Sequence, residues 1–88
     1  MKMVEQISEV DTVISSLNEI KDDISVPRNV RIKIETIIGT LKEDLELLIK
    51  INKALNELDG ISTDVNLHAY TRTQVWNIMS VLEKLVIK

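Results

Sequence analysis

Three arginines and one histidine are the residues of this 88-residue chain whose types and positions could bind a ligand. Arg28 and Arg31 follow Pro27, and Arg72 follows the single histidine, His68. Guanidinium groups bind phosphates and carboxylates, and the free amides at the start of a helix do the same. Both segments are predicted to begin helices, so their shared chemistry is the binding of an anion. The predicted anion- or partner-binding surface consists of Arg28, Asn29, Arg31, His68, Thr71 and Arg72.

A second interpretation places the arginine charges within the molecule. Acidic residues lie close to the arginines along the chain, at positions 22, 23, 59 and 64. Arg31 and Arg72 would neutralise these carboxylates and leave no need for an external anion. We favour this internal pairing, and the anion-binding surface is the alternative.

Other reactive groups are sparse. The chain has no cysteine, and a single histidine does not supply the two or more ligands that a transition-metal site needs. Neighbouring acids such as Glu43 and Asp44 point about 100° apart on a helix, so they do not converge as a general acid and base. The chain also has no glycine-rich phosphate loop. We therefore predict no catalytic residue, no metal, no cofactor and no enzymatic activity.

The composition predicts one small soluble domain over residues 1–88. A net charge of −3 argues against general affinity for nucleic acid or anionic membranes. Charged residues begin directly after the first methionine, and no apolar run approaches the ~20 residues that span a bilayer. The absence of cysteine fits a reducing compartment. These features predict a cytoplasmic protein that does not associate with membranes.

Apolar residues recur at intervals of three and four, which predicts helices and no strand. The first helix is predicted over residues 3–23. The second begins at Pro27, because proline suits a first helical turn. Gly39 is predicted to end it in a left-handed conformation. One kinked helix that continues through Gly39 is the alternative.

The third helix is predicted to begin at a capping box, Thr40-Leu41-Lys42-Glu43, and to run over 41–58. Asp59-Gly60 is predicted to end it, and the fourth helix is predicted to begin near residue 66 or 67. Short loops predict an all-α, four-helix, up-and-down bundle. In this topology the second and fourth helices start at the same end, so the arginines share one surface.

The chain also contains an internal repeat. Leu17-Asn18-Glu19-Ile20 recurs as Leu55-Asn56-Glu57-Leu58, and each copy precedes a polar loop and a helix that carries an arginine. The bundle is therefore predicted to consist of two related helical hairpins of about forty residues each.

Two segments resemble a known family. They are DISVPRNVR at residues 23–31, and Asp64-Val65-Asn66 together with TRTQVWNIMSVLE at residues 71–83. Both are similar to motifs of an archaeal family of short proteins, uncharacterised protein family UPF0147. The resemblance implies a four-helix fold and an archaeal source. It implies no activity and supplies no catalytic residue.

The third and fourth predicted helices are more apolar than a monomer core requires. Eight of fourteen residues are apolar over 45–58, and nine of thirteen over 75–87. A helix in a bundle buries roughly three residues in seven. Trp76 fits either the core or a partner interface. We predict a non-enzymatic protein-interaction module that forms a homodimer; the alternative is an RNA- or phosphate-associated factor. The predicted interface residues are Leu47, Ile51, Trp76 and Val81.

Overall fold

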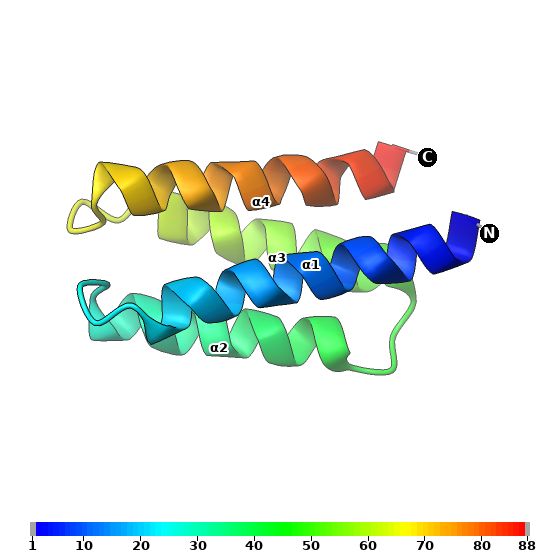
Figure 1. Cartoon of the computed structure of the whole chain (residues 1–88), viewed down its shortest axis with the longest axis horizontal. Helices are drawn as coiled ribbons and strands as arrows, with labels where there is room; N and C mark the ends of the chain where they lie inside the picture. The colour runs from blue at the N-terminus through cyan, green and yellow to red at the C-terminus, as the bar shows by residue number, and fades with distance from the viewer. Residues whose placement is uncertain (1, 88) are drawn as a thin grey trace.

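Four helices make up the described part of the chain in a computed structural model (Figure 1). The structure describes residues 2–87, with side chains from 9 to 86, and contains no strand in this range. The helices are α1 (Lys2–Asp22), α2 (Arg28–Lys42), α3 (Leu47–Ser62) and α4 (Ala69–Ile87). They run up and down along a molecule of 39 × 21 × 18 Å. The predicted all-α, four-helix bundle is confirmed.

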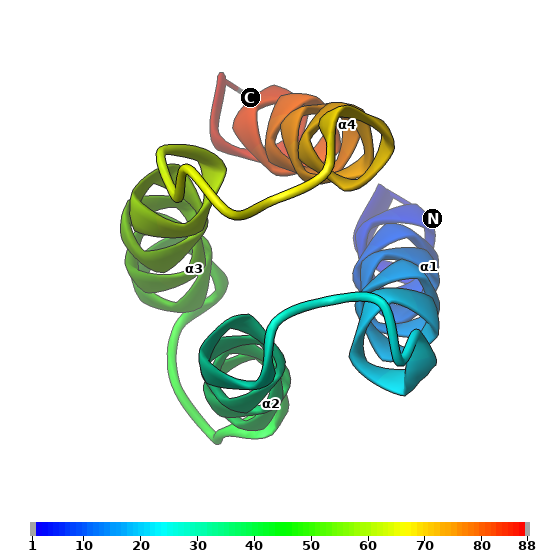
Figure 2. The ribbon, with the colours of Figure 1, turned by 90° about the vertical axis from the view of Figure 1, so that its left-hand side faces the viewer.

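The helices form a closed ring around one core. Each helix packs on the next one in the chain, and α1 completes the ring by packing on α4, although less closely than the other pairs (Figure 2). Every helix buries residues at intervals of three and four, as the apolar pattern predicts. The buried stripes are Val10, Val13, Leu17 and Ile20 in α1; Val30, Ile34, Ile37 and Leu41 in α2; Ile51, Ala54, Leu58 and Ile61 in α3; and Val75, Ile78, Leu82 and Leu85 in α4.

The predicted helix break at Gly39 is wrong. Helix α2 continues through Gly39 to Lys42, and neither glycine of the chain adopts a left-handed φ. Thr40 does not start a helix, because its hydroxyl donates to the carbonyl of Thr36 at 3.1 Å. Burial of Leu41 explains the continuation: a buried leucine contributes about 1.5–3 kcal/mol, which exceeds the ~1 kcal/mol cost of a helical glycine. The alternative, a helix that continues through Gly39, is confirmed at that residue, but the helix ends at Lys42 and residues 43–46 separate it from α3.

The predicted helix end at Asp59-Gly60 is wrong for the same reason. Helix α3 runs through Gly60 to Ser62, because Ile61 completes the buried stripe and is 1% exposed. The break over 23–27 is where the sequence predicts it, whereas α4 begins at Ala69, two or three residues later than predicted. Leu67 is buried in the preceding loop.

Replacing Gly39 and Gly60 with alanine should therefore stabilise the protein. Both glycines are exposed, and an added Cβ would meet nothing within 4 Å. Each substitution should raise the free energy of unfolding by about 0.5–1 kcal/mol, because alanine loses less backbone entropy in a helix. Urea titration followed by circular dichroism measures this. A loss of stability would instead indicate left-handed caps, which alanine disfavours.

The internal repeat is present in the structure, but in a different register from the sequence match. The buried stripe of α1 matches that of α3 when the chain is shifted by the 41 positions that separate Leu17 from Leu58. The sequence match pairs Leu17 with Leu55, which is only partly buried. The two related hairpins are thus α1–α2 and α3–α4, and the same shift pairs Arg31 with Arg72.

Candidate functional site

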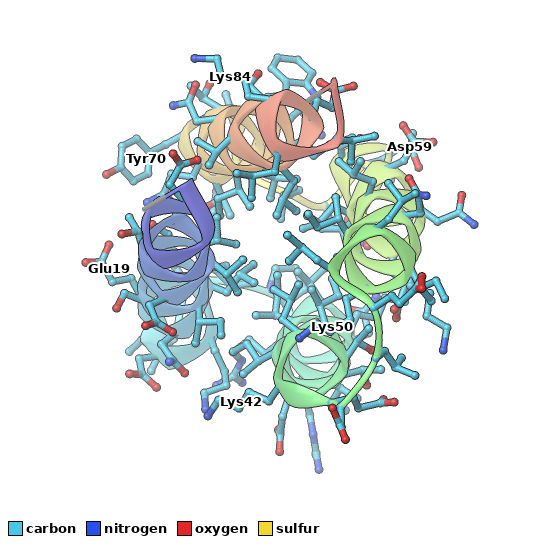
Figure 3. The ribbon with its side chains drawn as sticks, turned by 90° about the vertical axis from the view of Figure 1, so that its right-hand side faces the viewer. Glu19, Lys42, Lys50, Asp59, Tyr70 and Lys84 are labelled. Atoms are coloured by element: carbon cyan, nitrogen blue, oxygen red, sulfur yellow. The ribbon has the colours of Figure 1, made fainter. Side chains whose placement is uncertain are left out.

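The loops before α2 and α4 lie side by side at one end of the bundle, on the left in Figure 1. Asn29, the second residue of α2, connects this helix to the loop before α4, because its Nδ2 donates to Oδ2 of Asp64 at 3.3 Å. This contact confirms that the second and fourth helices start at the same end. Loop 43–46 lies at the other end, where Lys50 reaches back to α2 and its Nζ donates to the Leu41 carbonyl at 3.3 Å (Figure 3).

Both loops have the same construction. Oδ1 of Asp23 accepts from the Ser25 amide at 2.9 Å and the Ser25 hydroxyl at 2.7 Å, and Oδ1 of Asp64 accepts from the Asn66 amide at 2.8 Å. These are Asx turns, which hold the chain between two helices. The two hydrogen bonds from Ser25 stabilise the charged carboxylate and lower the pKa of Asp23, and the nearby His68 lowers it further. The acid is therefore part of a structural turn.

Arg72 is used within the fold. Its Nε donates to the carbonyl of Ser62 at 3.0 Å, and its Nη2 donates to the carbonyl of Asp64 at 2.9 Å. Positive charge stabilises the carbonyl end of α3, where main-chain acceptors have no partner in the helix. Internal use of Arg72 agrees with the favoured interpretation, but the groups that accept its hydrogen bonds are main-chain carbonyls and not the carboxylates that the sequence predicts.

Arg31 differs from Arg72, although the two occupy equivalent positions in the repeat. The Nε atom of Arg31 is buried and has no hydrogen-bond partner. Arg31 instead lines a hollow of about 220 Å³ between α1 and α2, together with Lys21 and Arg28. The sequence interpretation missed Lys21, which belongs to the last turn of α1. The sequence feature that could have identified Lys21 is its position, one helical turn after Leu17.

The six predicted surface residues do not form one site. Arg28 belongs to the hollow beside α1, Asn29 pairs with Asp64, and Arg72 holds the end of α3. Thr71 is 2% exposed, so its assignment to the surface is wrong: it occupies the core position that Val30 takes in the first hairpin. His68 is exposed next to the loop of Asp23.

The four residues predicted to form the dimer interface also differ in their burial. Ile51 is 1% exposed within the monomer core, so its assignment to an interface is wrong. Leu47 and Val81 are partly buried and pack against the core, whereas Trp76 is 53% exposed. On α3 the exposed large apolar side chains are Leu48, which is 52% exposed, and the adjacent Ile49. Neither was among the predicted interface residues.

A shallow groove of about 190 Å³ separates α1 from α4. Its floor is apolar and includes Val13 and Ile78, while Ser16 and Gln74 contribute polar walls. Val81 lies in this groove, so it faces α1 and does not share the exposed face of Trp76. Tyr70 projects from α4 on the same side as α1 (Figure 3).

Among the side chains that the structure describes, residues 9–86, no three of histidine, aspartate or glutamate gather in a way that could hold a metal ion. In the same part of the chain, none of the helices is both long and apolar enough to cross a membrane.

Comparison with known proteins agrees with this fold. The profile of an uncharacterised protein family, UPF0147, matches residues 1–85. The chain belongs to family UPF0147. A UPF0147 protein of Methanocaldococcus jannaschii is 44% identical over 69 residues, covering 77% of this chain and 74% of the relative. A UPF0147 protein of Archaeoglobus fulgidus is 34% identical over 79 residues, covering 90% and 91%.

A solved relative extends the comparison to three dimensions. The crystal structure of the unknown-function protein MMP1188 has a TM-score of 0.81 and 39% identity, and the match covers 85% of this chain and 86% of that one. UPF0147 is an uncharacterised family, so membership establishes the fold and the archaeal relatives without adding an activity.

Proposed function

We propose that this UPF0147 protein is a non-enzymatic helical module that forms a homodimer through the outer face of α3 and α4. The observation that carries the proposal is the exposure of two large apolar side chains, Leu48 on α3 and Trp76 on α4, each more than half exposed. Contiguous apolar patches are uncommon on monomeric proteins and mark contact surfaces.

Helical spacing places these side chains on one strip. Arg72 reaches Ser62, so this edge of α4 faces α3. Trp76, Met79 and Val86 follow Arg72 at successive intervals of four, three and seven, and therefore share its edge. On α3, Leu55 and Leu48 precede Ser62 at intervals of seven. Met79, Val86 and Leu55 are only partly buried, so they extend the apolar surface between Trp76 and Leu48. We call these five side chains the α3/α4 strip: Leu48, Leu55, Trp76, Met79 and Val86.

A second copy of the chain suits this strip. In a two-fold dimer one patch meets its own copy. Arg72 lies near one end of the strip and Glu83 near the other, so an antiparallel pair would place each arginine opposite the partner's glutamate. Burying Leu48 and Trp76 in the interface would contribute about 1 kcal/mol to the free energy of dimerisation for each of these half-exposed side chains. A specific dimer should bury at least about 1,000 Å² in total.

A non-enzymatic role is supported by the use of the polar groups. Asp23 is held by Ser25 in a loop turn, and Arg72 is held by main-chain carbonyls. These groups stabilise the ends of helices, and their hydrogen bonds occupy the atoms that catalysis would need free.

The experiment is light scattering coupled to size exclusion at micromolar concentrations. The chain weighs 10.0 kDa, so a dimer should have a mass of about 20 kDa. Trp76→Asp should return the mass to that of the monomer, because it replaces the most exposed side chain of the strip with a charge. Tyr70→Asp is the matched control: Tyr70 is an aromatic residue on the same helix, 72% exposed, on the side of α1. It should leave the dimer intact.

Two results would contradict the proposal. One is a wild-type mass near 10 kDa at every concentration. The other is a dimer that Tyr70→Asp disrupts as strongly as Trp76→Asp, which would move the interface to the α1 side of α4.

A further inference from the structure

We propose that Lys21, Arg28 and Arg31 form a binding site for a phosphate group in the hollow between α1 and α2. The three side chains come from two helices and line one space of about 220 Å³. Two guanidinium groups and an ammonium group around one hollow are the donors that bind a phosphate oxyanion. The site lies across the ring from the α3/α4 strip and is independent of the proposed dimer.

The internal repeat shows that Arg31 is available. Its counterpart Arg72 satisfies both Nε and Nη2 with carbonyls at the end of α3. The equivalent carbonyls for Arg31 belong to Lys21 and Asp23, 41 positions before Ser62 and Asp64, yet Nε of Arg31 has no partner. A buried donor without an acceptor is costly. A small rotation of the side chain towards a bound oxyanion would supply the missing acceptor.

The local charge favours an anion, although the whole chain carries a net charge of −3. The lining contributes three positive groups and one carboxylate, Glu35, so the hollow is positive. Arg28 is the first residue of α2, where the positive end of the helix dipole adds to the field. The rest of α1 is acidic, so the positive charge is confined to this hollow. A small anion would therefore bind here in preference to a long polyanion.

Ile32 supplies an apolar wall beside the cations and is 55% exposed. An exposed isoleucine next to the hollow suits the organic part of a phosphate ester. Free phosphate and a nucleoside monophosphate both present a tetrahedral phosphate group, so either could bind to these cations. Inorganic phosphate and adenosine monophosphate are therefore the two probes.

The test is a titration of each probe at low ionic strength, followed by amide chemical shifts in the full chain. We expect saturable shifts around residues 21, 28 and 31, with half-saturation at about 1 mM or below. Arg28→Ala should weaken binding about tenfold or more, because one charge-assisted contact is lost. Saturation by both probes with similar affinity indicates free phosphate as the ligand. A tenfold preference for adenosine monophosphate indicates the ester, with Ile32 as part of the site.

Lys33→Ala is the matched control. Lys33 is exposed on the same helix and carries the same charge, but it lies outside the lining of the hollow. It should bind both probes as the wild type does. Arg31→Ala should weaken binding while the amide spectrum outside the hollow stays unchanged, which separates ligand binding from a folding defect. The proposal is overturned if neither probe gives saturable shifts, or if Lys33→Ala weakens binding as much as Arg28→Ala.

Discussion

Replacing Ile51 with aspartate should unfold the protein. Ile51 is 1% exposed and belongs to the buried stripe of α3. An unpaired carboxylate at this position would be desolvated without compensation, at a cost of about 4 kcal/mol or more. A domain of this size has roughly 4–13 kcal/mol of stability in total. Circular dichroism should show a large loss of helicity, or a urea midpoint far below that of the wild type.

Ile49→Asp is the control for this prediction. Ile49 lies on the same helix but is 46% exposed, so its carboxylate would remain hydrated. This variant should keep its helicity, and its free energy of unfolding should fall by less than about 1 kcal/mol. A folded Ile51→Asp variant whose mass falls from dimer to monomer would contradict the structure and restore Ile51 to the interface.

Arg72→Ala should be the most destabilising change among the loop-end residues. It removes two hydrogen bonds from a charged group to the carbonyls of Ser62 and Asp64. Hydrogen bonds to charged groups contribute about 1.5–3 kcal/mol, and the loss leaves the end of α3 without its positive partner. We expect about 2–3 kcal/mol of destabilisation and a melting temperature lower by about 10 °C or more. Thermal unfolding measures both quantities.

Arg31→Ala tests the same prediction from the other half of the repeat. The two arginines are equivalent by position, but the buried Nε of Arg31 has no partner to lose. Its removal should change the free energy of unfolding by less than about 0.5 kcal/mol, or raise it slightly. Equal destabilisation by both variants would show that Arg31 caps α1 as Arg72 caps α3.

Together these variants separate residues that build the bundle from residues that are free to bind. Arg72 and Ile51 belong to the first group, because one closes the end of a helix and the other fills the core. Arg28 and Trp76 belong to the second, because their side chains face the hollow and the solvent. Both proposed contacts therefore rest on side chains whose replacement should leave the fold intact.

The sequence by itself determined the class of the fold and much of its layout. Apolar intervals of three and four require helices, and Pro27 places the first break, since proline fixes the backbone at a helix start. The motifs at 23–31, 64–66 and 71–83 were sufficient to indicate the family. Up-and-down topology followed from short loops and placed both arginine-bearing helix starts at one end.

Only the tertiary structure decided where the other helices end and which side chains are free. Gly39 and Gly60 are local stop signals, but burial of Leu41 and Ile61 in the common core outweighs them. The actual break at 43–46 contains neither glycine nor proline, so no local signal marks it. Composition revealed surplus apolar residues, whereas the choice between Ile51 and Leu48 depends on the rotation of α3 about its axis. The packing of the four helices sets that rotation, and it also leaves Arg31 without the partners that Arg72 has.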